Sequence, residues 1–163
     1  MSSEGASDIE RIILAARSDQ VEELVEILKT SDNIDINGTD SIGQTALHWA
    51  CIAGSYECAE ALLSFETINT DLQDLVLRET PLHKVFNPVK SPKISEILVG
   101  LLLEQSAKYK LKNREGLSAV DLVPKDKEFE EVRQQLLQAE ASSLLDLPVE
   151  DSDDDGTASD ISE

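Results

Sequence analysis

A short pattern that occurs three times at a nearly constant interval limits what this chain can fold into. It is fullest in segment 43–54, which reads GQTALHWACIAG. The TALH of residues 45–48 returns as TPLH at 80–83, 35 residues later, and as SAVD at 118–121, a further 38 residues on. An interval of this length is typical of proteins that stack similar helical units into an elongated array.

The residue types within segment 43–54 predict a turn followed by a short helix. Gly43 can adopt the positive φ that a hairpin tip requires, and Thr45 can accept a hydrogen bond from a backbone N–H at the start of the helix. Leu47 and Ala50 then lie on one face of the helix, and Gly54 ends it. One unit cannot bury its apolar face alone, so we expect neighbouring units to stack.

Together with Glu57 and Leu62-Leu63, which follow it, segment 43–54 resembles one ankyrin repeat, and weaker similarity extends over residues 7–141. The resemblance implies an all-α fold, an ankyrin-repeat solenoid of about four helix-turn-helix units with short β-hairpin fingers. A disordered acidic tail is expected to follow the solenoid.

We divide the chain into a flexible N-terminus, four repeat units and the acidic tail, which cover residues 1–6, 7–36, 37–70, 71–111, 112–141 and 142–163. The first unit has no finger and begins near Ser7, with Asp19 at the position of the helix-ending glycine. The third unit has Arg78 at the glycine position of its finger. Prolines in its inter-helix turn predict a protruding loop at 87–93, and its second helix is expected to start at about Ile94.

The last unit is predicted to end in a capping helix over residues 128–141. One face of this helix carries Phe129, Val132, Leu136 and Leu137. We expect Leu144, Leu145 and Leu147 to pack against the same helix. The alternative is that these leucines and the acids after them form a short strand that resembles a SUMO-interacting motif.

Composition and length favour a single intracellular domain. The chain has 163 residues, which suits one domain. No stretch approaches the roughly 20 apolar residues of a membrane span, and the first residues do not resemble a signal sequence. We therefore expect no membrane attachment and a location in the cytoplasm or nucleus. Two cysteines provide no disulfide framework and are expected to stay reduced there.

Charge is distributed unevenly along the chain, whose net charge is −19. Residues 1–77 carry 15 acidic and 3 basic side chains, residues 78–127 carry 6 and 10, and residues 128–163 carry 12 and 1. The basic side chains of the middle segment form two groups, Arg78, Lys84, Lys90 and Lys93, and then Lys108, Lys110, Lys112 and Arg114. Phosphate would repel a chain this acidic, so we expect no nucleic acid partner, and a basic protein fits better.

The segment 149–163 contains no aromatic and no basic residue, and this composition predicts disorder. Three roles remain open for it: a solubilising extension, an electrostatic lure for a cationic client, or a competitor that folds back on the basic residues within 84–93. Ser152 and Thr157 each precede an acid by three residues, which is typical of sites for acidophilic kinases.

His48, Cys51 and Cys58 are close enough in sequence to suggest a metal site or a Cys–His nucleophile, but packing explains them more simply. The family resemblance implies that His48 and His83 hydrogen-bond the backbone of the neighbouring repeat, that both cysteines occupy core positions, and that Trp49 packs between helices. A structural zinc site needs four ligands. We expect no metal, no cofactor and no enzymatic activity.

Positions that the family leaves variable, on the finger tips and on the concave side of the first helices, are the candidates for partner contact. They are Ser41, Ile42, Gln44, Ile52 and Ala53 in the second unit, Val76, Leu77, Glu79, Lys84 and Asn87 in the third, and Arg114, Glu115 and Leu117 in the fourth. Four of them are expected to form an apolar strip flanked by charge, as a specific interface requires: Ile42, Ile52, Val76 and Leu77.

These features predict a monomeric, non-enzymatic protein-protein interaction module, an adaptor or dedicated chaperone that binds another protein through its concave face and fingers. One alternative is an escort that uses the acidic tail to hold a ribosomal protein or another basic client. A second is a regulatory subunit of a larger complex, such as an assembly factor. In architecture the chain is similar to small fungal-type ankyrin proteins that escort a basic ribosomal protein, and to ankyrin chaperones that assemble proteasome subunits.

Overall fold

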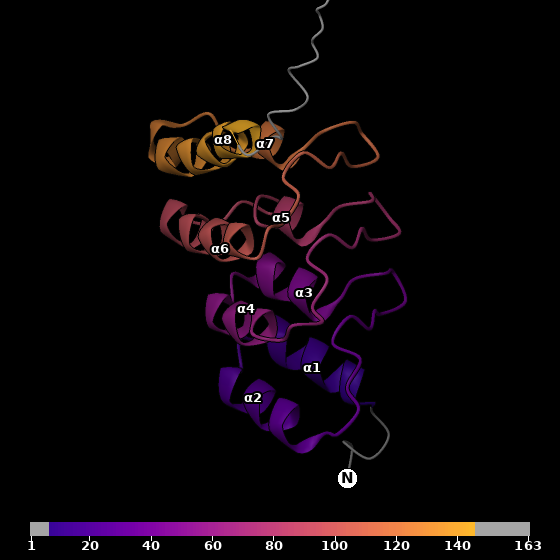
Figure 1. The fold of residues 1–163 in the computed structure, drawn as a ribbon. Helices are drawn as coiled ribbons and strands as arrows, with labels where there is room; N and C mark the ends of the chain where they lie inside the picture. Colours follow the sequence, from indigo (N-terminus) through magenta and orange to yellow (C-terminus); the bar gives the residue numbers. More distant parts are fainter. Residues whose placement is uncertain (1–6, 146–163) are drawn as a thin grey trace, which may run out of the picture.

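The computed structural model describes residues 7–145, which form pairs of helices stacked one above another (Figure 1). In chain order the elements are α1 (Asp8–Arg17), α2 (Val21–Thr30), α3 (Ala46–Ala53), α4 (Tyr56–Leu63), α5 (Pro81–Lys84), α6 (Pro92–Glu104), α7 (Ala119–Leu122), the 3-10 helix η2 (Lys127–Phe129) and α8 (Glu130–Leu145). Loops that we call fingers project to one side before α3, α5 and α7 (Figure 1). This arrangement confirms the expected all-α repeat fold.

Side-chain caps start the helices where the sequence predicts them. The hydroxyl of Ser7 accepts a hydrogen bond from the N–H of Glu10, and the hydroxyl of Thr45 accepts one from the N–H of His48. Gly54 ends α3 at φ 77°, in the left-handed region where a side chain would be strained. The predicted starts of α1 and α3 and the predicted end of α3 are therefore confirmed.

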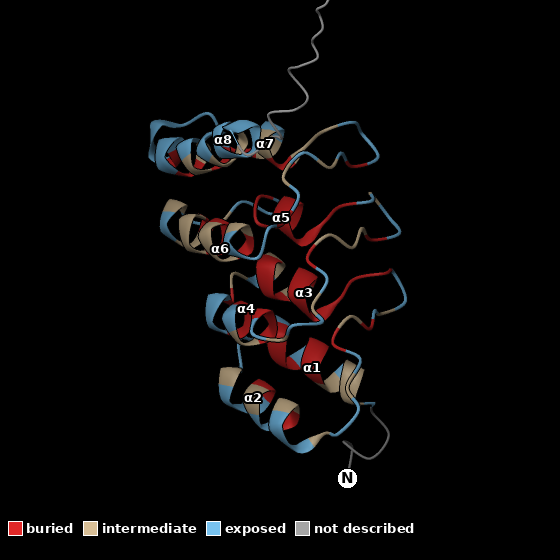
Figure 2. Cartoon of the chain, in the orientation of Figure 1, coloured by how far each residue is buried: buried red, intermediate tan, exposed pale blue. Residues whose placement is uncertain are grey.

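The inner row of helices, α1, α3 and α5, carries much of the buried surface (Figure 2). α3 packs against α1 on one side and α5 on the other, and its Leu47, Ala50 and Cys51 are fully buried. Cys58 on α4 is also fully buried, and both thiols are free. Burial raises the pKa of Cys51 to about 12, so this thiol stays protonated at neutral pH. The predicted core positions of the two cysteines are confirmed.

The third unit departs from the second as its sequence suggests. α5 is a single turn, and Asn87 in the loop that follows is exposed. Ser91 caps α6, which begins at Pro92, two residues before the predicted Ile94. In its finger, Arg78 adopts φ 56°, close to the conformation that glycine takes in the second finger. Asp19, in the turn between α1 and α2, also has a positive φ, 58°.

The last helix is longer and less fully packed than predicted. α8 runs to Leu145, so the boundary set at residue 141 is too early. Phe129, Val132 and Leu136 are buried, but Leu137 is 42% exposed. The expected packing of Leu144 and Leu145 is also wrong: they are 57% and 85% exposed.

Residues outside 7–145 carry several of the predictions. The flexible N-terminus, the acidic tail beyond Leu145 and the phosphorylation candidates Ser152 and Thr157 all lie outside the described residues. Among the helices of 7–145, none is long and apolar enough to cross a bilayer.

Candidate interaction surface

Each finger is shaped by one carboxylate or amide side chain that caps its own loop. The Oδ1 atom of Asp40 accepts hydrogen bonds from two N–H groups of the second finger at 3.0 and 2.9 Å. Asp74 does the same in the third finger at 3.1 and 3.0 Å, and Asn113 in the fourth at 2.9 and 2.9 Å. These loops are hydrogen-bonded turns and not β-hairpins with regular strands. The described fingers contain a single β-bridge, between Thr39 and Thr45.

These three side chains are not among the residues predicted from the sequence, although their spacing gives a signal. Asp40 lies five residues before the helix cap Thr45, and Asn113 five residues before the cap Ser118. Asp and Asn side chains commonly bond backbone two residues onward and so stabilise turns. Asp74 lies six residues before the cap Thr80, so an Asp or Asn five or six residues before a cap indicates the start of a finger.

Backbone hydrogen bonds join neighbouring fingers tip to tip. The N–H of Leu75 in the third finger donates to the carbonyl of Ile42 in the second at 2.9 Å. The N–H of Arg114 in the fourth finger donates to the carbonyl of Leu77 in the third at 2.7 Å. The three fingers therefore hold one another in register.

Two histidines form a second set of links below the tips. The Nδ1 of His48 accepts from the N–H of Thr45, so its Nε2 carries the proton and donates to the carbonyl of Glu79 at 2.9 Å. His83 repeats this arrangement and bonds the carbonyl of Leu117 at 2.9 Å. Burial lowers the pKa of His48, which keeps the ring neutral. The predicted inter-repeat role of both histidines is confirmed.

The structure leaves many of the predicted contact residues accessible. Those that are exposed are Ser41, Ile42, Ala53, Val76, Asn87, Arg114 and Glu115, and those that are partly buried are Ile52, Leu77 and Leu117. Leu75, which sequence analysis did not select, is 65% exposed.

Three exposed apolar side chains lie on the joined tips of the second and third fingers. Ile42 is 39% exposed, Leu75 65% and Val76 50%, and we call this set the finger strip. It differs from the predicted strip, since Ile52 and Leu77 are both half-buried. The third finger has one more residue between its Asp and its cap than the second.

Three predicted contact residues, Gln44, Glu79 and Lys84, are instead buried. The Nζ of Lys84 lies 2.9 Å from the Oδ2 of Asp74 and 2.9 Å from the Oε1 of Glu79. The side chain of Lys84 is 8% exposed, that of Asp74 0% and that of Glu79 2%. Charges can be buried when they are paired and hydrogen-bonded in this way. Lys84, Asp74 and Glu79, which we call the Lys84 cluster, are too deeply buried to contact a partner.

Amide side chains from neighbouring units complete the Lys84 cluster. The Nε2 of Gln44 in the second unit donates to Asp74 at 3.2 Å, and the Nδ2 of Asn113 in the fourth unit donates to Glu79 at 3.2 Å. Burial acts to raise the pKa of Asp74, but the hydrogen bonds from Lys84 and its other donors outweigh it, and the pKa falls to about 2. Hydrogen bonds to the cluster therefore join the second, third and fourth units.

The basic group predicted around the third finger is smaller than its sequence suggests. Lys84 is buried, and the Nζ of Lys90 donates to the carbonyl of Lys84 at 3.0 Å. Burial lowers the pKa of Lys90 to about 8. Lys93 is exposed, and its Nζ lies 3.4 Å from the Oε1 of Glu96. Arg78 and Lys93 of this group stay exposed, whereas all four cations of the second group are exposed: Lys108, Lys110, Lys112 and Arg114.

Trp49 links the helix row to the second finger. Its Nε1 donates to the Oδ2 of Asp40 at 2.9 Å, and the guanidinium of Arg17 lies 4.8 Å from the ring centre. The ring is partly buried against the core. Trp49 packs as predicted and also holds the finger through a hydrogen bond.

No group of three or more His, Cys, Asp or Glu side chains within residues 7–145 is arranged to hold a metal ion.

Comparison with known proteins agrees with this geometry. A family model of ankyrin repeats, in three copies, matches residues 12–113. The ankyrin repeat-containing protein YGL242C of Saccharomyces cerevisiae is 30% identical over 135 residues, which cover 77% of this chain and 75% of the yeast protein.

Proposed function

The chain belongs to the ankyrin-repeat family, and on this basis we propose that it is an adaptor or dedicated chaperone that holds one partner protein through its fingers. Ankyrin repeats form protein-protein interaction modules and are typically not enzymes. The scaffold is shared among many proteins, so the partner is selected by the side chains that the scaffold presents.

The finger strip is the observation that carries the proposal. Ile42, Leu75 and Val76 place apolar side chains in solvent on turns that backbone hydrogen bonds hold rigid. Side chains on a rigid support lose little conformational entropy on binding, so more of the contact energy is available for affinity. Exposed Arg78 lies on the third finger, and Arg114 of the fourth finger donates to the carbonyl of Leu75 at 3.3 Å, so both supply a polar rim.

A matched pair of substitutions tests this assignment. We expect Val76→Asp to weaken binding of the partner at least about tenfold, because a charge in the apolar centre of an interface loses its water. Val89→Asp is the control, since Val89 is 55% exposed but lies in the loop between α5 and α6. The partner is first identified by affinity purification and mass spectrometry, and titration calorimetry then measures both variants. Equal affinities would remove the finger strip from the interface.

The alternative, an escort for a basic client, would use a different face. The outer helices α2 and α4 carry five exposed acids, Glu22, Glu23, Glu26, Glu57 and Glu60. Together with the acidic residues beyond Leu145 they would attract a cationic protein of the cytoplasm or nucleus. Binding to this face should weaken steeply as salt rises, whereas binding to the finger strip should change little. The same titrations, repeated at low and high salt, separate the two functions.

A further inference from the structure

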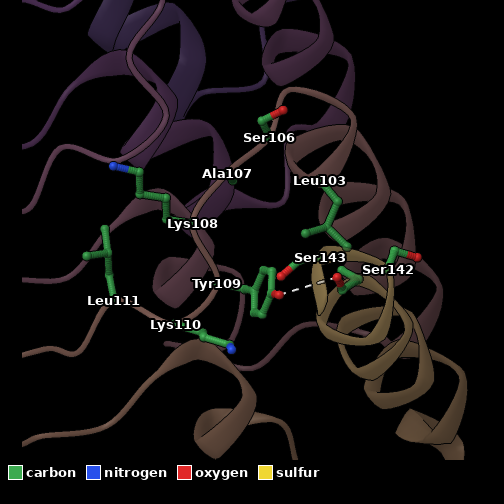
Figure 3. A pocket seen from close by; sticks show the side chains of 10 residues that line it. Leu103, Ser106, Ala107, Lys108, Tyr109, Lys110, Leu111, Ser142 and Ser143 are labelled. Atoms are coloured by element: carbon green, nitrogen blue, oxygen red, sulfur yellow. Dashed lines mark hydrogen bonds between the residues drawn. The ribbon is translucent and has the colours of Figure 1, made fainter. Parts of the chain in front are cut away.

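An open groove lies at the C-terminal end of the stack, and no residue of the finger strip lines it. Figure 3 shows its lining residues. Its volume is about 650 Å³, and it is formed by the end of α6, the segment 106–111 and the last turns of α8. Leu103, Tyr109, Leu111 and Ala139 provide apolar walls, and the hydroxyl of Tyr109 donates to the carbonyl of Ala139 at 3.3 Å. The groove is therefore suited to an extended segment with apolar side chains.

Lysines give this groove a positive edge. Lys108 is exposed and forms no ion pair within residues 7–145. The Nζ of Lys110 lies 3.7 Å from the Oε2 of Glu140 on α8. The two side chains are 59% and 43% exposed. An ion pair this exposed contributes little, so Lys110 can exchange Glu140 for another carboxylate at small cost.

The chain itself supplies a complementary segment at the edge of the groove. Ser142 and Ser143 line the groove, and α8 ends two residues later at Leu145. Residues 146–163 then contain eight acidic residues and no basic residue, with Leu147 and Val149 among the acids. Pro148 disfavours helix at the residue before it, so α8 is not expected to carry this segment straight on.

The distances allow the segment to turn back. Glu140, the partner of Lys110, precedes Leu145 by five residues, which in an α-helix span about 8 Å. An extended chain covers that distance with about three residues. Glu150, five residues after Leu145, is therefore within reach of Lys110 and Lys108.

We propose that residues 146–163 bind back into the groove between α6 and α8, with their carboxylates on Lys108 and Lys110 and their apolar residues against Tyr109 and Leu111. A tethered segment acts at a high effective concentration, so weak contacts are enough to hold it. The third unit presents fewer cations to such a segment, because Lys84 is buried in its cluster and Lys90 bonds backbone carbonyls. An acidic peptide of another protein would have to displace it.

Zero-length carbodiimide cross-linking of the full chain, read by mass spectrometry, tests the proposal. We expect Lys108 and Lys110 to form at least about five times more links to residues 146–163 than Lys125 and Lys127 do, owing to the local concentration of the bound segment. The control lysines are exposed and closer in sequence, which makes the comparison stringent. Equal yields would overturn the proposal. Links between chains that carry different isotope labels would also overturn it, because they would show that the segment binds a second copy of the protein.

Backbone NMR of the full chain provides an independent readout. Replacing all eight acids of residues 146–163 with Asn or Gln should shift the amide signals of 106–111 and 139–143, and K108Q/K110Q should shift the signals of the acidic segment. The control K125Q/K127Q should leave those signals in place. Unchanged signals at 106–111 after neutralisation would contradict binding in the groove.

Discussion

Lys84 shows how strongly one buried charge can depend on its neighbours. Its ammonium group faces Asp74 and Glu79, and Gln44 and Asn113 supply further hydrogen bonds from the adjoining units. Burial acts to lower the pKa of Lys84, but the two carboxylates outweigh it and raise the pKa. Lys84 is therefore charged at neutral pH, and it depends on the two carboxylates beside it.

Removing the cation should destabilise the fold. Lys84→Met leaves two buried carboxylates with no opposite charge, so we expect the free energy of unfolding to fall by about 3–5 kcal/mol in urea titrations. Lys93→Met is the control, because its side chain is 77% exposed, and should change stability by less than about 0.5 kcal/mol. The triple variant D74N/E79Q/K84M should recover part of the loss. A Lys84→Met variant as stable as Lys93→Met would contradict the structural role of the cluster.

Asp74 should make stability depend on acid pH. Its pKa is lowered to about 2 in the fold, against about 3.9 in an unfolded chain. A lowered carboxyl pKa contributes stability that is present above the unfolded value and is lost as pH falls through the folded value. We expect urea stability to decline between about pH 4 and pH 2, and to decline less steeply in Asp74→Asn. Parallel curves for the two proteins would show that another group is responsible.

At the scale of elements, the fingers are held by contacts between their tips. Gly43 and Gly116 occupy equivalent turns with φ 83° and 81°. A Cβ at Gly43 would lie 2.7 Å from the Cγ of Leu75 and 2.9 Å from its backbone nitrogen, whereas a Cβ at Gly116 would meet nothing within 4 Å. The two glycines share a backbone requirement, but only Gly43 must also leave room for the next finger.

This difference gives a matched test of finger contact. Both Gly43→Ala and Gly116→Ala should lose about 1–2 kcal/mol to the positive φ. Gly43→Ala should lose more, because the backbone of Leu75 cannot move aside cheaply, and it should displace the finger strip. Chemical denaturation measures the stability, and partner titration measures the displacement. Equal losses in both assays would show that the two fingertips do not need close contact.

At the scale of the whole molecule, each helix pair depends on the next for burial. α3 packs against α1 and α5, and α6 packs against α4 and α8, so no pair has a core of its own. Arrays of this kind gain stability from nearest-neighbour interfaces and unfold together when they are short. The stack should therefore respond as one unit to damage at its centre.

Leu47→Ala tests this cooperativity, because Leu47 is fully buried. We expect a loss of about 2–5 kcal/mol, with a single transition at lower temperature. Circular dichroism reports on all helices and the fluorescence of Trp49, the single tryptophan, reports on the second unit. The two signals should coincide. The exposed Leu137→Ala is the control, and separate transitions for the two probes would contradict a cooperative stack.

The sequence by itself determined the features that depend on local interactions. Thr45 caps the helix that starts one residue later, and Gly43 and Gly54 take conformations that their lack of a side chain permits. The repeat interval then predicted stacking and the inter-repeat bonds of His48 and His83. Such features can be predicted from sequence because the residues that interact are a few positions apart or recur at the repeat distance.

Only the tertiary structure decided which side chains reach solvent. Lys84 and Glu79 have the polarity of surface residues, yet in the stack they are buried, and Asn113 of the next unit donates a hydrogen bond to Glu79. Leu75 is apolar, yet it is 65% exposed on the third finger. Burial depends on groups that meet across units, and the energies of buried charges are set by the environment that the stacked units create rather than by the residue itself.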